Sequence, residues 1–238
     1  MAYDSGLIAY WKLNDATGTI ASDTINGFSG GVSGATWTSG ILASGLKFDG
    51  DDYVSVGSAT AISVGSYFSI SAWIFPRVWN NGGGTAIRLI SKVDDANNHY
   101  LLTAVNAGIP GSDLPMFRVK RAGTIVATYN SATYLQAGSW HNIVGVYSGN
   151  ITYLYVNGGS VGGEGDQGMG DGVAPHLYFG ARNTVGPFLS GTMDDIRYYN
   201  YALSAAQVTD IYNGGAGSEY ASGGGVTPSA FMSPRRFW

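Results

Sequence analysis

Short strand-like runs separated by glycine-rich turns dominate this sequence. In residues 67–76, YFSISAWIFP, the apolar side chains of Phe68, Ile70 and Ile74 alternate with small polar ones, which is the period of a strand with one buried face. Asp-Gly, Asn-Gly, Gly-Gly and Ser-Gly pairs lie between such runs and are typical of tight turns. The other runs lie at 7–13, 45–48, 53–56, 87–92, 100–105, 116–121, 124–129, 141–147, 152–156, 177–180 and 193–199. This pattern predicts an all-β antiparallel sandwich or barrel rather than alternating βα units.

Composition and charge exclude several classes of protein. The chain has 238 residues, enough for one large sandwich, and a formal net charge of −4 with only 12 lysines and arginines. We therefore expect neither nucleic acid nor an anionic membrane as a partner. Cysteine is absent, so disulfides and thiolate metal sites are excluded. The N-terminus lacks the basic and apolar regions of a secretion signal and no apolar run reaches about 18 residues, so we expect a soluble chain without an export signal.

One helix is predicted, at residues 202–212, ALSAAQVTDIY, where the apolar residues fall on one face. Ser204 supplies an N-cap, and Gln207, three residues later, completes a capping box. Gly214 and Gly215 are expected to end the helix.

The composition changes after this helix. Residues 1–213 form the predicted domain, residues 214–225 a flexible Gly/Ser linker, and residues 226–238 an apolar C-terminal anchor peptide. The anchor docks either on its own sandwich or on a neighbouring subunit or different protein, with aromatic and arginine side chains as the contacts. Its expected contact residues are Phe231, Met232, Arg235, Arg236, Phe237 and Trp238.

Ordered phrases along residues 6–213 carry a resemblance to a known family. They are GLIAYWKLNDATGT, SGLKFDGDDYVSV, FSISAWIFP, ISK, WHNIVGVY, TYLYVNG, LYFGAR and GTMDDIRYYNYALSAAQV. Together they resemble the laminin-G-like, concanavalin A-like jelly-roll family. The resemblance implies a two-sheet antiparallel jelly-roll sandwich whose concave sheet often presents a ligand groove. Its members serve as lectin-like and adhesion modules, accessory domains of glycosidases, and surface modules of viruses and bacteria.

The acidic residues argue against an enzyme. The related glucanases carry Glu-x-Asp-x-Glu on one strand, where a period of two points all three side chains into one groove. This chain has only two glutamates, Glu164 and Glu219, and we expect both to lie in glycine-rich loops. The aspartate pairs 51–52, 94–95 and 194–195 are neighbours in sequence, and neighbours on a strand point to opposite faces. We therefore expect a non-catalytic protein.

The resemblance also implies a structural calcium ion at the edge of the sandwich. Its ligands are an aspartate that opens the last strand, here Asp194, and oxygens of an early loop, here Asp23 in residues 22–27. The alternative is that Asp23 makes a turn and Asp194 caps a strand edge. Strand parity places Asp195 with Met193 and Arg197, which predicts a modest surface pair between Asp195 and Arg197.

Two further sets of residues are candidates for binding. Asp49, Asp51 and Asp52 in FDGDDYV form either a simple β-turn or a ligand site at the rim of the sandwich. Aromatic rings stack on sugars while amide and guanidinium groups hold the hydroxyls, although each such residue also has an alternative role in the core or on the surface. The candidate glycan-binding residues are Trp79, Asn80, Asn81, Tyr100, Arg118 and Arg182.

From these observations we expect a non-catalytic carbohydrate-binding or adhesion-type module displayed in a larger assembly, a homo-oligomer or a capsid-type array. A virion-surface or decoration protein anchored through its C-terminal tail fits the missing signal and the apolar tail. The alternatives are an extracellular, secreted bacterial lectin or adhesin module and the accessory domain of a glycoside hydrolase.

Overall fold

The computed structural model describes residues 6–57, 62, 67–77, 87–93, 99–109, 112–121, 124–129, 133–149, 151–165, 176–184 and 186–219. Their strands are β1 (Leu7–Trp11), β2 (Ile20–Ala21), β3 (Gly30–Ser33), β4 (Thr36–Ser39), β5 (Ser44–Asp49), β6 (Tyr53–Val56), β7 (Tyr67–Pro76), β8 (Ile87–Val93), β9 (His99–Ile109), β10 (Ser112–Arg121), β11 (Thr124–Tyr129), β12 (Leu135–Gln136), β13 (His141–Ser148), β14 (Ile151–Val156), β15 (Gly159–Gly165), β16 (Leu177–Phe179) and β17 (Ser190–Tyr199). A helix, α1 (Ala205–Tyr212), and a short 3-10 turn, η3 (Asn213–Gly215), follow them.

The strands form two antiparallel sheets, which confirms the predicted jelly-roll sandwich. An eight-stranded sheet has the order β15-β14-β13-β7-β17-β5-β4, with β1 paired to β17. A nine-stranded sheet has the order β11-β10-β9-β8-β16-β6-β3-β2, with β12 paired to β10. Every predicted strand run is present. Sequence periodicity missed β2, β3, β4, β12 and β15, because these strands are very short or glycine-rich and lack a regular alternation.

The main core lies between the two sheets. On β7, the buried side chains of Phe68 and Ile70 belong to it, as does Phe117 of β10 in the opposite sheet. The rings of Phe68 and Phe117 meet edge to face with their centroids 5.9 Å apart. Each such buried aromatic contributes about 1.5–3 kcal/mol through removal of its apolar surface from water. This packing holds the sheets face to face.

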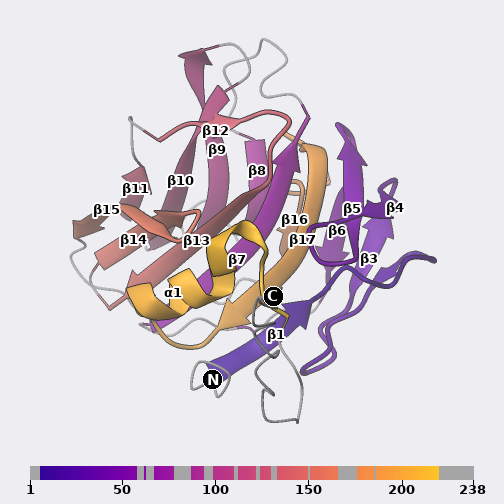
Figure 1. Cartoon of the computed structure of the whole chain (residues 1–238), viewed down its shortest axis with the longest axis horizontal. Helices are drawn as coiled ribbons and strands as arrows, with labels where there is room; N and C mark the ends of the chain where they lie inside the picture. Colours follow the sequence, from indigo (N-terminus) through magenta and orange to yellow (C-terminus); the bar gives the residue numbers. More distant parts are fainter. Residues whose placement is uncertain are drawn as a thin grey trace, which may run out of the picture.

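Helix α1 covers the outer face of the eight-stranded sheet (Figure 1). Val208 and Ile211 of α1 pack with Val144 and Val146 of β13 in a second apolar cluster. The outer face of the nine-stranded sheet therefore lies on the opposite side of the sandwich from α1.

The predicted capping box of α1 is confirmed. The Ser204 hydroxyl accepts the Gln207 N–H at 3.3 Å, and the Gln207 side chain accepts the Ser204 N–H at 2.8 Å. The helix starts at Ala205 and ends at Tyr212. Asn213, and not a glycine, takes the first left-handed position after it, with φ 48°. Asparagine tolerates this conformation because its short polar side chain hydrogen-bonds locally, here to Gly217 O at 2.7 Å.

The first residues assigned to the linker, 214–219, lie against the sandwich. Gly217 donates its N–H to Tyr212 O at 3.2 Å, and Ser218 O accepts a hydrogen bond from the side chain of Arg197. Lys12 and Glu219 form an ion pair at 3.8 Å. Residues 220–238, with the whole predicted anchor, lie outside the described part of the chain.

Candidate functional site

Asp194 and Asp195 occupy a β-bulge on β17. Before the bulge, residues 190–193 pair with β5, and after it residues 196–199 pair with β1. Asp194 pairs with Trp73 of β7, and Arg197 pairs with Ser71. Three residues along β17 therefore match two along β7, so β17 carries one extra residue. Asp195 adopts a left-handed conformation with φ 52°.

The extra residue changes the faces of the strand. Met193, Ile196 and Tyr198 all lie in the main core, which strict alternation would not allow. The prediction that Met193 shares a face with Asp195 and Arg197 is therefore wrong. A bulge restores the inward direction of the later apolar residues, and periodicity alone does not reveal it.

Asp195 and Arg197 do pair, but the pair is buried and not on the surface. Arg197 donates from Nε at 3.0 Å and from Nη2 at 2.8 Å, both to Oδ1 of Asp195. The exposed fractions are 0% for Asp195 and 1% for Arg197. The Tyr10 ring lies beneath the guanidinium, and the Arg197 Cζ atom is 4.9 Å from the ring centroid. Burial lowers the pKa of Arg197, but the charge and hydrogen bond of Asp195, together with Tyr199 and Tyr10, outweigh burial and keep that pKa above its ordinary value.

Asp194 holds the loop that precedes β5. Its Oδ2 accepts the Leu42 N–H at 2.8 Å, while its buried Oδ1 has no hydrogen-bond partner among the described residues. Burial raises the pKa of Asp194 to about 7, and the neighbouring Asp195 charge adds to this rise although the Leu42 N–H opposes it. Gly40 is required here, because a Cβ at that position would collide with Asp194 Oδ2 and with the Ser44 carbonyl.

Both carboxylate oxygens of Asp23 accept hydrogen bonds from backbone N–H groups. Its Oδ1 accepts the N–H groups of Tyr10 and Ile25 at 2.8 and 3.0 Å. Its Oδ2 accepts those of Asn26 and Phe28 at 3.0 and 2.9 Å. A carboxylate has about four acceptor positions, so all of them are used. Asp23 thus shapes the turn of residues 23–28 and ties it to β1.

This geometry does not fit a calcium ion bound jointly by Asp23 and Asp194. An ion at Asp23 would have to displace N–H donors that already satisfy the carboxylate. The backbone of β1 also lies between the two chain segments, since Trp11 pairs with Asp23 on one side and with Ile196 of β17 on the other. Asp194 alone keeps an oxygen free, and calcium there stays a prediction.

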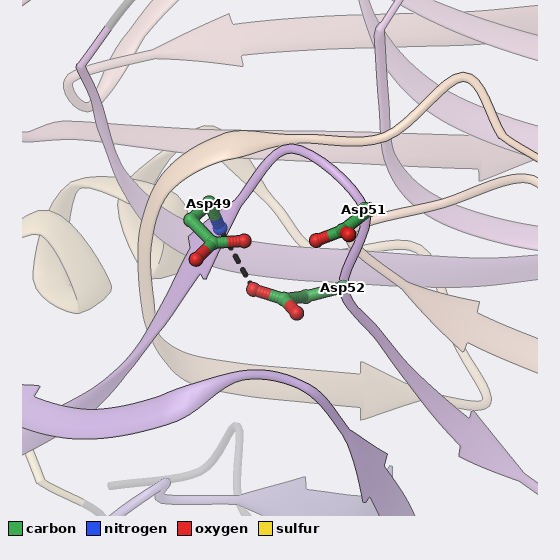
Figure 2. A group of neighbouring side chains, drawn as sticks. All are labelled: Asp49, Asp51 and Asp52. Atoms are coloured by element: carbon green, nitrogen blue, oxygen red, sulfur yellow. Dashed lines mark hydrogen bonds between the residues drawn. The ribbon is translucent and has the colours of Figure 1, made fainter.

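Three aspartates gather in the turn between β5 and β6 (Figure 2). One carboxylate oxygen from each of Asp49, Asp51 and Asp52 lies within 4.8 Å of the others, so the group could hold a metal ion. The buried Asp52 accepts the Asp49 N–H at 2.8 Å, and burial raises the pKa of Asp52. Gly50, with φ 116°, reverses the chain. The expectation that neighbouring acids point apart holds for strands and does not apply in this turn.

Aromatic side chains follow one another on the outer face of the nine-stranded sheet. Tyr53 and Tyr178 alternate with core residues of β6 and β16, which places both on the outer side. Their rings meet edge to face at 6.2 Å, and the Phe188 ring stacks on Tyr53 at 6.5 Å. Ser55, in register with Tyr178, adds a hydroxyl to the same row.

Three arginines lie beside this row. Arg118 of β10 alternates with two core residues, and Arg182 follows β16. Both were predicted as ligand contacts, and the structure brings them together: the positive charge of Arg182 adds to burial in lowering the pKa of Arg118. Sequence reasoning missed Arg88 of β8, whose pKa burial and the charges of Arg118 and Arg182 lower to about 10. The alternation of Arg88 with Ile87 and Leu89, which are both buried, was the sequence signal that could have placed Arg88 on the outer face.

The remaining predicted contacts are not placed. Trp79, Asn80 and Asn81 lie outside the described residues, as does the anchor peptide. Tyr100 lies in β9, in register with Lys92 and Val119, and nothing is described of its side chain. Among the described residues, no helix has both the length and the apolar character needed to cross a membrane.

Two antiparallel sheets packed face to face, with one short helix near the C-terminus, define a jelly-roll sandwich of the lectin/glucanase-like kind. The chain belongs to the concanavalin A-like lectin/glucanases superfamily, whose family model matches residues 48–209. A comparison with curated proteins finds no matching sequence.

Several solved structures share the fold. Domain 4 of AbnA, a GH43 extracellular arabinanase from Geobacillus stearothermophilus solved with arabinotriose, is 18% identical with a TM-score of 0.68, and the match covers 86% of this chain and 97% of that one. The binding domain of Paraclostridial Mosquitocidal Protein 1 is 17% identical with a TM-score of 0.68, covering 87% of this chain and 52% of that one. Trypanosoma rangeli sialidase in complex with the inhibitor DANA is 17% identical with a TM-score of 0.63, covering 89% and 34%. At these identities the likeness establishes the fold alone.

Proposed function

We propose that this domain is a non-catalytic carbohydrate-binding module whose ligand lies on the outer face of the nine-stranded sheet. The observation that carries this proposal is the row of Tyr53, Tyr178 and Phe188 on the face away from α1. Aromatic rings pack on the apolar faces of sugar rings, and the adjacent arginines and serines supply hydrogen bonds to hydroxyl groups. The likeness to an arabinanase domain solved with arabinotriose supports this choice of ligand class.

The acidic turn favours binding over hydrolysis. Glycosidases place two carboxyl groups about 5–9.5 Å apart on either side of the scissile bond. Asp49, Asp51 and Asp52 lie side by side in one turn, with one oxygen of each within 4.8 Å of the others, and Asp52 is engaged with the Asp49 backbone. These residues are arranged to hold their own turn or a cation, which supports a non-catalytic role.

Two settings for this module are proposed. The first is display on a virion surface or a similar array, anchored through residues 226–238. The second is an extracellular lectin or adhesin module, or an accessory domain of a glycoside hydrolase. The likeness to a single domain of an arabinanase favours the accessory role.

The test is a glycan array with the full chain, followed by calorimetry on the glycans that bind. Tyr178→Ala is expected to weaken binding at least tenfold, a loss of about 1.4 kcal/mol. Tyr67→Ala is the matched control, because Tyr67 is an exposed tyrosine of β7 in the other sheet. Equal affinity of both variants would overturn the proposed face. Release of reducing sugar by the wild type, lost in Asp52→Asn, would overturn the non-catalytic role.

A further inference from the structure

We infer that the sugar bound at this face carries an acidic group, a carboxylate or a sulfate, which is held by Arg88, Arg118 and Arg182. The inference rests on the proposed function and specifies its ligand class. Three separate observations lead to it: the clustering of like charges, the donors that Arg88 and Thr103 leave unused among the described residues, and the aromatic row beside the arginines.

The three arginines come from parts of the chain that only the fold brings together. Arg88 lies on β8, and Arg118 lies two strands away on β10. Arg182 comes three residues after the end of β16, which flanks β8 on its other side. The charges of both partners act on the partly buried Arg88 and favour its neutral form. Like charges held together in a partly desolvated place are unfavourable unless an anion compensates them.

Arg88 and the neighbouring Thr103 have hydrogen-bond donors without partners among the described residues. The Nε and Nη1 atoms of Arg88 are buried and have no hydrogen-bond partner among the described residues. Thr103 of β9 stands directly opposite Arg88, on the same side of the sheet, and its fully buried hydroxyl likewise has no partner in the described part of the chain. Guanidinium groups only donate, so an acceptor is required. Carboxylate and sulfate oxygens are acceptors, and with a guanidinium they form charge-assisted bonds stronger than those of neutral hydroxyls.

The aromatic row favours a sugar as the carrier of the acidic group. Ser91 connects the two halves: it is in register with Tyr178 on β16, and its hydroxyl donates to the carbonyl oxygens of Ala181 and Arg182 at 2.6 and 3.1 Å. From β16 to β10 there are three strand spacings of about 4.8 Å each, about 14 Å in all. A ligand that contacts both Tyr178 and Arg118 is therefore longer than one sugar ring, which points to an acidic oligosaccharide.

The chain as a whole is acidic, with a formal net charge of −4. General electrostatic attraction would therefore not draw an anionic glycan to it. Binding of such a ligand must come from this local cluster, and added salt should weaken it, because all three arginines are partly exposed and charges in contact with water are screened.

The experiment measures dissociation constants of the full chain for three probes by calorimetry at 50 and 500 mM NaCl. The probes are an oligogalacturonate, a heparin-derived oligosaccharide and neutral arabinotriose. The two acidic probes distinguish a carboxylate from a sulfate. We expect at least one of them to bind at least tenfold more tightly than arabinotriose at 50 mM NaCl, and to lose most of this advantage at 500 mM.

Arg88→Gln is expected to weaken binding of the acidic probe at least tenfold and to weaken binding of arabinotriose several-fold less, because a guanidinium bonds more strongly to an anionic acceptor than to a neutral hydroxyl. If Arg88→Gln fails to fold, Arg182→Gln replaces it, because Arg182 lies outside the strands; the same loss of acidic-probe binding is expected. The matched control is Arg77→Gln, since Arg77 is exposed at the end of β7 and carries the same charge.

The outcomes separate this inference from the function it rests on. If a neutral sugar binds as tightly as the acidic ones and Tyr178→Ala weakens it, the face binds glycans and the acidic ligand is wrong. If inorganic sulfate competes fully and Tyr178→Ala has no effect, the cluster is a simple anion site and both proposals fail. Loss of acidic-probe binding in Arg77→Gln equal to that in Arg88→Gln would also overturn the inference.

Discussion

Arg197 places two of its N–H donors on a single oxygen of Asp195, two residues before it on β17, at 3.0 and 2.8 Å. Asp195 is the left-handed residue of the β-bulge, so the pair lies where β17 changes its register against β7. Arg197 also donates to the Ser218 carbonyl, so this buried pair connects β17 to the segment that follows α1.

Breaking the pair should destabilise the domain strongly. Asp195→Ala leaves the Arg197 charge buried without its counter-ion, and we expect a loss of about 3–5 kcal/mol in the free energy of unfolding. Urea titration measures it. Glu219→Gln, which removes the partly exposed Lys12–Glu219 pair, should cost less than about 1 kcal/mol. Similar losses in both variants would contradict the structural importance of the buried pair.

Asp194 should make stability depend on pH. Its pKa in the folded protein, about 7, lies above its ordinary value of 3.8, so the folded state holds a proton that the unfolded chain releases. The stabilisation is fully present below about pH 4 and is lost as the pH rises to 7, on the order of 4 kcal/mol in total. Asp194→Asn, which keeps an acceptor for Leu42, should therefore gain stability relative to the wild type as the pH rises in EDTA. A constant difference between the two proteins from pH 4 to 8 would show that this carboxyl does not titrate as expected.

The variant Asp23→Asn distinguishes a role of Asp23 in shaping its turn from a role as a calcium ligand. The amide offers only one acceptor oxygen, so the N–H groups now bound by the other oxygen lose their partner, at a cost of about 1–3 kcal/mol. Thermal unfolding should show the same loss with EDTA and with calcium, whereas Asp210→Asn on the exposed side of α1 should be nearly neutral. Calcium stabilisation of the wild type that disappears in Asp23→Asn would instead support the calcium site.

The contact between Gly40 and Asp194 predicts intolerance of a single methyl group. Gly40→Ala should destabilise the domain by about 1–3 kcal/mol, because the Cβ meets both the carboxylate and the Ser44 carbonyl. Gly159→Ala is the control, since its nearest neighbour would be the Val156 carbonyl at an ordinary 3.6 Å. Chemical denaturation of both variants checks this, and equal stability would mean that the loop moves aside without cost.

The sequence by itself determined the elements and their class. Alternation of apolar residues is a property of residues two apart, so it identified strands such as β7 without knowledge of their partners. The capping box of Ser204 and Gln207 is equally local, and it located α1 to within three residues.

Only the tertiary structure decided where the acids and arginines act. The bulge at Asp195 depends on how β17 pairs with its neighbours, and the burial of Arg197 depends on the chain that returns to it at Ser218. Arg88, Arg118 and Arg182 are far apart in the chain and meet because the strand order places β8 beside β16 and two strands from β10. Charges and hydrogen bonds act through space, so their consequences are set by neighbours that local sequence patterns do not contain.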